Sequence, residues 1–307
     1  MPPDELESVL SRCVPGEGNL DIHRLGNGLV NETYRVLRDG SAYAVRVAAA
    51  NSFDLGLDRA WEAHVLERAV AADLAPELAY CDPQRGILIA RWVDGRSWGP
   101  VDVRRQSNIA RMAELMRRIH ALPIPAPARV MSPTTWIGHY SAAARQNAAG
   151  ARTAAEELRT AATARLAALA LLPSVDPVVC HSDLHTLNLV DRGRSLVLLD
   201  WEYAHAADPI WDLAGWSANN DLEDELKHDL LASYAGRPPT RNEYQRLELL
   251  GWLYDYVCLL WSELYLNLHR DDRPGAAAPG GETPGGIAAR ARLLAARLNA
   301  SPSSRAD

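Results

Sequence analysis

Residues 178–204 read VVCHSDLHTLNLVDRGRSLVLLDWEYA, and this stretch decides the fold. Two short apolar runs in it, 187–190 and 195–199, are typical of buried strands. An Asp-Arg-Gly turn joins them, so the stretch predicts a short β-hairpin. Polar side chains that can hold a metal or move a proton lie within or beside these runs: Asp183, Asn188, Asp200 and Glu202.

The spacing of these side chains predicts a shared site. Asp200 ends an apolar run, and Glu202, two residues later, is expected to point to the same side. A tight loop after His181 can aim Asp183 and Asn188 at one point. We expect His181 to brace this loop rather than to react.

The chemistry of the set is that of hard oxygen donors. Such donors suit Mg²⁺, which leaves positions open for phosphates and water. Asn188 and Asp200 are therefore the expected metal ligands, with Glu202 as a further candidate. Asp183 then remains as a base for an attacking hydroxyl, and a metal with a base is what phosphoryl transfer requires.

The first hundred residues predict a small antiparallel sheet with one inserted helix. Alternating apolar and polar residues surround Asp39-Gly40, a pair that strongly favours a hairpin turn. Apolar residues at helical spacing follow, and then two further apolar runs. The expected elements are a helix at 4–13, a hairpin within 25–49, a helix at 57–74 and strands at 77–82 and 86–93.

The rest of the chain predicts a mainly helical lobe. Helices are expected at 102–121, 141–171, 209–218, 221–234, 241–269 and 285–298. Residues 271–284 are rich in Pro and Gly and predict a loop. The expected organisation is a β-rich N-terminal lobe at 1–94, a helical lobe at 95–300 that contains the acidic segment, and a disordered tail at 301–307. A cleft between the lobes is the expected ligand site.

Composition narrows the class of protein. The 307 residues carry a net charge of −7, which argues against a nucleic-acid-binding surface. The four cysteines form no CxxC pair, so a zinc or redox motif is not indicated. The N-terminus lacks the apolar core of a signal peptide, and no apolar run reaches the roughly 18 residues of a membrane span. We expect a cytoplasmic protein with no membrane partner, and the oligomeric state stays open.

Three motifs carry a resemblance to a known superfamily. HSDLHTLNLV resembles the catalytic loop, and LLDWEYA the metal-binding segment, of the protein-kinase-like small-molecule phosphotransferases. These include aminoglycoside phosphotransferases, choline/ethanolamine kinases and thiamine kinases. DPIWDLAGW (208–216) is similar to the next helix of that superfamily. The resemblance implies a bilobal α+β fold of the protein-kinase type, with an N-terminal ATP-binding lobe at 1–94 and the catalytic loop and substrate site in the helical lobe at 95–300. It also implies that Asp212 braces the catalytic loop.

The N-terminal motifs resemble those of bacterial choline- and thiamine-kinase-type proteins. GNGLVNETYRV is followed by YAVRV, which places Arg46 where protein kinases carry a lysine. The resemblance implies that Arg46 reaches the ATP phosphates and pairs with Glu62, or with Glu67 on the same helix. Arginine keeps the charge and adds a planar fork that matches phosphate.

ATP contacts are also expected from two neighbouring segments. The sequence has no GxGxxG, so Asn31 and Thr33 are expected to help cover the phosphates with their side chains. Adenine is expected against the segment around 91–93, with hydrogen bonds from the backbone of Arg91, Trp92 and Val93.

The aromatic composition bears on the acceptor. Phe occurs once, Trp nine times and Tyr ten times. Such residues can form a cage around a cationic nitrogen, although packing in the core explains the same pattern and stays open. The expected substrate-binding residues are Trp211, Trp216, Tyr254 and Trp261.

These observations predict an ATP- and Mg²⁺-dependent kinase for the hydroxyl group of a small, cationic metabolite such as choline, ethanolamine or thiamine. An aminoglycoside-type phosphotransferase is an alternative, because Asp221, Glu223, Asp224 and Glu225 supply acids for a polycationic substrate. An inactive nucleotide-binding pseudokinase module is an alternative of another class.

Overall fold

A β-hairpin that turns at Asp39-Gly40 forms the centre of the N-terminal lobe. The computed structural model describes residues 3–27, 30–48, 55–147, 153–269 and 284–300. In it, strand β2 (Asn31–Arg38) pairs along its whole length with β3 (Ser41–Ala48). Asp39 and Gly40 have φ angles of 48° and 75°, the left-handed pair that a tight hairpin requires. The predicted hairpin is confirmed.

The hairpin is part of a five-stranded antiparallel sheet, in the order β1-β2-β3-β5-β4. Helix α2 (Arg59–Ala71) is inserted between β3 and β4, as the sequence predicts. Helix α1 (Pro3–Cys13) packs on the sheet and shares its hydrophobic core. The remaining strands are β1 (Asp21–Asn27), β4 (Leu78–Asp82) and β5 (Ile87–Arg91).

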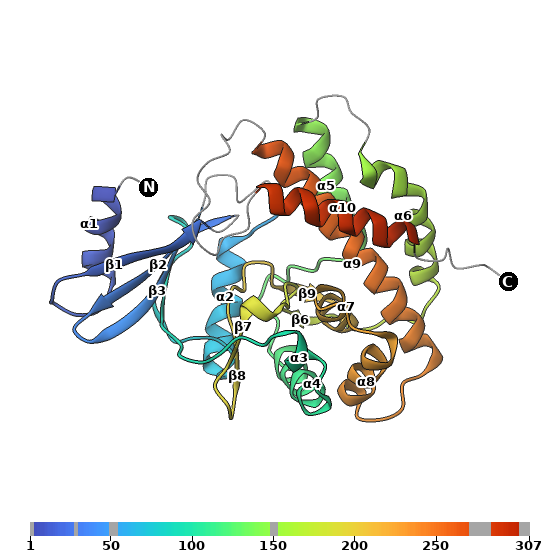
Figure 1. The fold of residues 1–307 in the computed structure, drawn as a ribbon, viewed down its shortest axis with the longest axis horizontal. Coiled ribbons are helices and arrows are strands. Elements are labelled where there is room, and N and C mark those ends of the chain that lie inside the picture. The colour runs from blue at the N-terminus through green and yellow to red at the C-terminus, as the bar shows by residue number, and fades with distance from the viewer. Residues whose placement is uncertain (1–2, 28–29, 49–54, 148–152, 270–283, 301–307) are drawn as a thin grey trace.

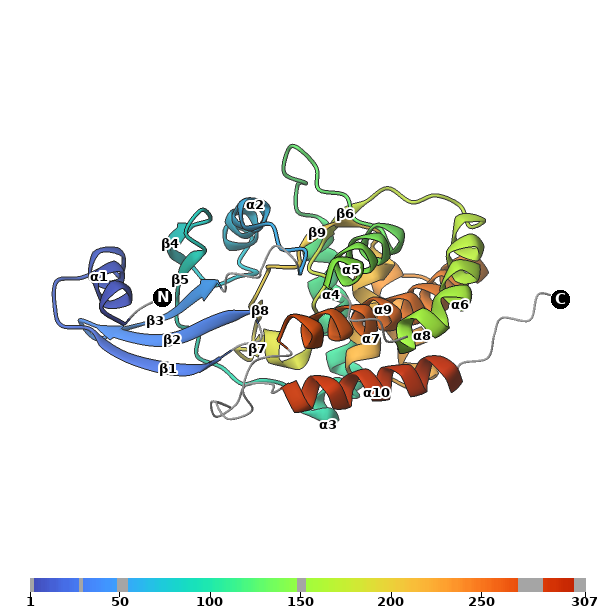
Figure 2. The ribbon, with the colours of Figure 1, turned by 90° about the horizontal axis from the view of Figure 1, so that it is seen from above.

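Helix α2 joins the two lobes. It lies between the sheet and the helical part of the molecule in both ribbon views (Figures 1 and 2). The carboxylate of Asp58 accepts the N–H of Trp61 at 3.0 Å and so caps the helix, which places Glu62 in the first turn. Trp61 and Val65 pack into the core of the helical lobe rather than into that of the sheet. The position of Glu62 is therefore fixed from both lobes.

The second lobe is mainly helical, and two of its predicted helices are each divided in two. The segment predicted as 102–121 breaks at Arg104-Arg105. The segment predicted as 141–171 is replaced by two helices, Pro133–Asn147 and Ala154–Ala170. Thr153 and Glu156 form a capping box at the start of the second of these. Residues 148–152, most of the predicted loop 271–284 and the tail 301–307 lie outside the described residues. The helices are α3 (Pro100–Val103), α4 (Gln106–His120), α5 (Pro133–Asn147), α6 (Ala154–Ala170), α7 (Ile210–Asn219), α8 (Asp224–Ala235), α9 (Arg241–Leu268) and α10 (Pro284–Ala300).

The second lobe also contains two small sheets. β6 (Val178–Cys180) pairs with β9 (His205–Ala207), and β7 (Leu189–Asp191) pairs with β8 (Leu196–Leu198). The second pair is the predicted hairpin. A single 3₁₀ turn, η1 (Thr186–Asn188), precedes β7. Among the described residues, no helix combines the length and the apolar character that a membrane span requires.

Candidate active site

The loop between β6 and η1 holds Asp183, and helix α7 fixes the backbone of this loop. The N–H groups of His181 and Ser182 donate to the Asp212 carboxylate at 2.9 and 2.7 Å. Asp212 is 1% exposed and lies in the first turn of α7. Ser182 has a φ of 70°, which costs energy for a residue with a side chain. The two bonds to Asp212 offset that strain.

The carboxylate of Asp183 is reachable and ionised. Its side chain is 29% exposed. Asn188 donates from Nδ2 to Oδ2 of Asp183 at 3.0 Å, and His185 lies 3.4 Å from the same oxygen. Burial alone would raise the pKa of Asp183, but His185 and then His181 outweigh it and lower the pKa to about 2. Asp183 therefore carries a full negative charge at neutral pH.

The β7–β8 hairpin brings Asn188 and Asp200 to the same end. The N–H of Leu199 donates to the carbonyl of Asn188 at 2.8 Å, which extends the strand pairing by one step. His181 contacts the carbonyl of Leu199 at 2.9 Å through Nε2 and so ties the hairpin to the loop of Asp183. Asp200 follows with a φ of 57° and a side chain that is 35% exposed. An amide and a carboxylate at one hairpin end form the hard-oxygen donor set that fits Mg²⁺.

A network of charges connects this hairpin end to the N-terminal lobe. Arg46 of β3 bonds to Glu62 of α2, and its Nη1 lies 2.5 Å from Oδ1 of Asp200. Arg59, three residues before Glu62, bonds to Glu62 at 2.9 Å and to Glu202 at 2.8 Å. Glu62 is thus the acid beside Arg46.

The other acid considered for Arg46 lies elsewhere. Glu67 has a side chain that is 69% exposed, and it lies 4.0 Å from His64 on the surface of α2.

Glu202 is the buried acid of this network. It is 5% exposed and accepts a 2.7 Å hydrogen bond from Nδ2 of Asn31, while Oδ1 of Asn31 accepts from Arg59 at 2.8 Å. Burial, and then the charge of Asp200, raise the pKa of Glu202 to about 7. Asn31, expected at the phosphates, is bonded to Arg59 and Glu202 instead, and a nucleotide must share it with them.

The other residues expected at ATP lie on or beside the sheet. Thr33 pairs with Arg46 across β2 and β3. The N–H groups of Arg91 and Trp92 already donate to carbonyls of the sheet, at 2.8 and 2.9 Å. Val93, the next residue, is therefore the remaining N–H donor of the three.

The aromatic residues separate into two groups. Trp211, Trp216 and Tyr254 are each less than 5% exposed, and Trp216 packs edge-on against Trp98. Trp261 is half-buried, and its indole N–H donates to the hydroxyl of Tyr203 at 2.7 Å. Only Trp261 of the four expected residues therefore combines an aromatic face with partial exposure.

Sequence reasoning missed three residues here. Tyr203 directly follows Glu202, so its position in the DWEYA motif was a usable signal. Arg59 lies one helical turn before Glu62, and that spacing was also readable. Trp136 of α5, 6.2 Å from the Tyr203 ring, could not be found because nothing in the sequence brings α5 to this hairpin.

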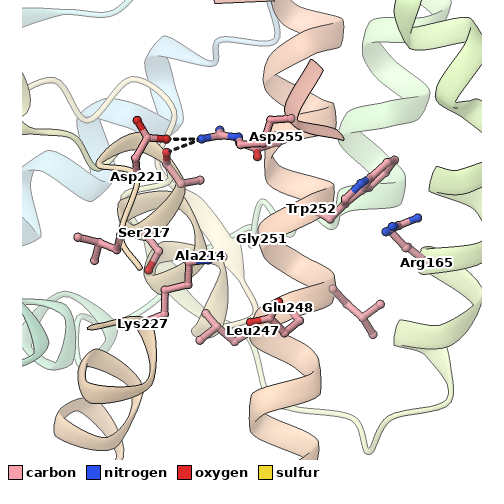
Figure 3. Close-up of a pocket in the computed structure, with 14 residues that line it drawn as sticks. Arg165, Ala214, Ser217, Asp221, Lys227, Leu247, Glu248, Gly251, Trp252 and Asp255 are labelled. Atoms are coloured by element: carbon pink, nitrogen blue, oxygen red, sulfur yellow. Dashed lines mark hydrogen bonds and ion pairs between the residues drawn. The ribbon is translucent and has the colours of Figure 1, made fainter. Parts of the chain in front are cut away.

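A cavity of about 480 Å³ lies apart from these residues (Figure 3). It is lined by α6, α7, α8, α9 and the end of α10, and none of the acids at the hairpin end faces it. Arg297 bonds to Asp221 and Asp255 at its rim. Because none of the expected site residues lines this cavity, we place the site at Asp183.

Comparison with known proteins bears on the family and the fold. The sequence profile described as "Phosphotransferase enzyme family" matches residues 21–250. Protein LicA of Haemophilus influenzae is 20% identical over 244 residues, which cover 77% of this chain and 71% of that protein. The structure of choline kinase LicA from Streptococcus pneumoniae superposes with a TM-score of 0.77 at 20% identity, covering 97% of this chain and 99% of that one.

An antibiotic-bound structure has the same fold. The gentamicin complex of APH(2″)-IIa superposes with a TM-score of 0.67 at 14% identity, covering 99% of this chain and 98% of that one. The predicted bilobal, protein-kinase-like fold is confirmed. Because the profile begins at β1, includes both the ion-pair network and the Asp183 loop, and extends over more than half of the sequence, this chain belongs to the phosphotransferase enzyme family.

Proposed function

We propose that the protein is an ATP- and Mg²⁺-dependent kinase that phosphorylates the hydroxyl group of a small cationic alcohol of the choline, ethanolamine or thiamine type. One observation carries the proposal. The Asp183 carboxylate is ionised and partly exposed, and it lies at a hairpin end where Asn188 and Asp200 meet.

In this proposal Asp183 orients the acceptor hydroxyl and takes its proton. A carboxylate with a low pKa is a weak base, so its main contribution is to hold the hydroxyl in line while the phosphoryl group transfers. Asn188 and Asp200 would hold Mg²⁺, which neutralises charge on the ATP phosphates when it is bound. Arg46 already contacts Oδ1 of Asp200, so the metal would share this carboxylate with Arg46 or displace it.

The nucleotide is assigned to the N-terminal lobe. Arg46, held by Glu62, is expected to bind the phosphates once a ligand separates it from Asp200. Asn31 and Thr33 of β2 flank that position. The backbone of 91–93 is expected to bind adenine, with the N–H of Val93 as its donor.

The cationic acceptor is assigned to the rings of Tyr203 and Trp261. Burial first, and several neighbouring anionic groups including Asp183, raise the pKa of Tyr203 well above its usual value. Tyr203 is therefore within electrostatic range of the proposed base, and Trp261 is bonded to it. An ammonium group between their rings and Asp183 would gain both cation–π and ionic attraction. The relatives named as choline kinases support this class of acceptor.

The aminoglycoside alternative has less support from the surface acids. Asp221 is paired with Arg297 at 2.6 Å, Glu223 with Arg104 at 3.2 Å, and Asp224 with Lys227 at 2.8 Å. Three of the four acids considered for a polycationic substrate therefore already have cationic partners. The pseudokinase alternative conflicts with the presence of Asp183, Asn188 and Asp200 together.

A screen of acceptors tests the proposal. ADP release from Mg·ATP is measured with choline, ethanolamine, thiamine, homoserine and kanamycin, with and without EDTA. We expect turnover with a cationic alcohol and none with EDTA. Turnover with kanamycin alone would favour the antibiotic kinase, and ATP binding without turnover on any acceptor would favour the pseudokinase.

A further inference from the structure

The carbonyl groups on either side of Asp183 are held by two side chains that the proposed chemistry does not use. The carbonyl of Leu184 accepts a 3.0 Å hydrogen bond from Nδ2 of Asn219. The carbonyl of Ser182 accepts a longer one, 3.4 Å, from the hydroxyl of Tyr254. A second hydrogen of Asn219 Nδ2 joins the two side chains, because it donates to the Tyr254 hydroxyl at 3.0 Å.

The orientation of the Asn219 amide is fixed by its own partners. Its oxygen accepts from Nη2 of Arg290, on helix α10, at 3.2 Å. Its nitrogen then faces the other way, where one N–H donates to the carbonyl of Leu184 in the loop and the other to the hydroxyl of Tyr254 on α9. Every polar atom of the Asn219 side chain therefore has a partner, which is the condition under which a partly buried polar network rigidifies a structure.

Helix α7 holds the backbone of the catalytic loop on both sides of Asp183. Asp212 and Asn219 are seven residues apart, two helical turns, and so lie on one face of α7. Asp212 takes the N–H groups before Asp183, and Asn219 donates to the carbonyl after it.

Tyr254 reaches the loop because α7 has a glycine between these two residues. A Cβ atom at Gly215 would lie 2.7 Å from Cε2 of the Tyr254 ring. A side chain at position 215 would push the ring of Tyr254, and with it the hydroxyl, away from the loop.

We propose that Asn219 and Tyr254 are positioning residues for phosphoryl transfer, which keep Asp183 aligned by holding the backbone carbonyls next to it. The inference rests on the proposed role of Asp183. It assigns Tyr254, expected from the sequence to contact the substrate, to the support of the loop.

The test compares two hydroxyl deletions on helix α9. Tyr254→Phe removes the hydroxyl that contacts the loop. Tyr256→Phe, two residues later, removes a hydroxyl that donates to the carbonyl of Ala155 at 2.9 Å, away from the loop. Asn219→Leu keeps the approximate side-chain volume and removes both N–H donors. Each is assayed with Mg·ATP and the alcohol from the screen that supports turnover, beside Asp183→Asn.

We expect Tyr254→Phe and Asn219→Leu to lower kcat about tenfold while the KM for ATP stays unchanged, because the loss of alignment acts on the chemical step. We expect Tyr256→Phe to lower only the melting temperature. Hydrogen exchange of a peptide covering 178–190 gives a readout that needs no acceptor substrate. Exchange should become faster in Tyr254→Phe and Asn219→Leu but not in Tyr256→Phe.

The inference would be overturned if hydrogen exchange and kcat were unchanged in both Tyr254→Phe and Asn219→Leu. It would also be overturned if Tyr256→Phe showed the same faster exchange and lower kcat as these two variants. If Asn219→Leu fails to fold, Tyr254→Phe still decides the question. Normal activity in Asp183→Asn would instead reject the proposed function. Faster loop exchange in Tyr254→Phe would even then show that the hydroxyl holds the loop.

Discussion

Arg46 and Asp200 are bonded to each other: Nη1 of the arginine lies 2.5 Å from Oδ1 of the aspartate. The residue expected to bind the phosphates thus contacts the residue expected to bind the metal. Both are also held by neighbours, Arg46 by Glu62 and Asp200 by the hairpin end. If the proposed roles hold, we expect Mg·ATP to compete with this contact, since each residue would then face the ligand.

The first prediction concerns Arg46. Arg46→Ala should raise the KM for ATP and lower kcat, because the phosphates lose a positioning group. Arg46→Lys should retain part of the activity, because a point charge still attracts phosphate. A double-mutant cycle of Arg46→Ala with Glu62→Ala, measured on KM for ATP, should be strongly non-additive. Additive effects would mean that the pair does not act as a unit.

The second prediction separates the base from the metal ligand. Asp183→Asn keeps the shape of the side chain but removes the charged carboxylate that orients the hydroxyl and takes its proton, so kcat should fall by about 10²–10⁴-fold. ATP affinity, measured by calorimetry with Mg²⁺, should hardly change. Asp200→Ala should show the opposite pattern and lose Mg²⁺-dependent ATP binding. Normal Mg·ATP affinity in Asp200→Ala would remove Asp200 from the metal site.

The third prediction concerns the acceptor. Trp261→Leu should raise the KM of the cationic acceptor about thirtyfold and leave the KM for ATP unchanged, since a desolvated cation–π contact contributes about 2 kcal/mol. Trp216→Leu is the matched control, because Trp216 is 1% exposed and packs against Trp98. That variant should melt at a lower temperature with an unchanged acceptor KM. If Trp261→Leu and Trp216→Leu both differ from the wild type only in melting temperature, with an unchanged acceptor KM, the aromatic cage is excluded.

The fourth prediction is a pH dependence of stability from His205. This residue is fully buried, and Nε1 of Trp136 donates to its Nε2 at 3.4 Å. Burial lowers the pKa of His205 from 6.5 to about 4. In the unfolded chain His205 therefore becomes protonated below about pH 6.5, whereas in the folded chain it stays neutral until about pH 4. Stability is complete above pH 6.5 and falls as the pH drops toward 4, by ~3 kcal/mol at most.

His205→Gln should remove this part of the pH dependence. The free energy of unfolding of both proteins is measured by urea titration from pH 7.5 to 4.5, with His64→Gln on the exposed side of α2 as the control. The difference between wild type and His205→Gln should shrink as the pH falls. A constant difference across this range would contradict the prediction.

The sequence predicted the parts of the fold that depend on local signals. The Asp39-Gly40 turn is a property of two residues, and the hairpin that ends at Asp200 follows from short apolar runs around a turn. The helix boundaries were less well predicted, because the break at Arg104-Arg105 depends on how α3 and α4 pack rather than on a breaker residue.

The candidate site was predictable where motif order fixes it. Asp183, Asn188 and Asp200 lie within one short segment, so their proximity could be read from the chain. The contact between Tyr203 and Trp261 joins residues 58 positions apart, and no pattern within either segment indicates it. Trp211 and Trp216 were expected at a surface, yet helix periodicity does not distinguish a face that lines a pocket from a face that packs in the core.

Because Asp212 and Asn219 are two helical turns apart on α7, the support of the catalytic loop depends more on the number of residues between them than on which residues these are. Removing one residue between them would rotate Asn219 by about 100° around the helix axis and shift it by about 1.5 Å along it. Its amide would then face away from Leu184, even though every polar side chain was still present. Position 215 aside, we expect the residues between them to tolerate substitution better than they tolerate a single insertion or deletion.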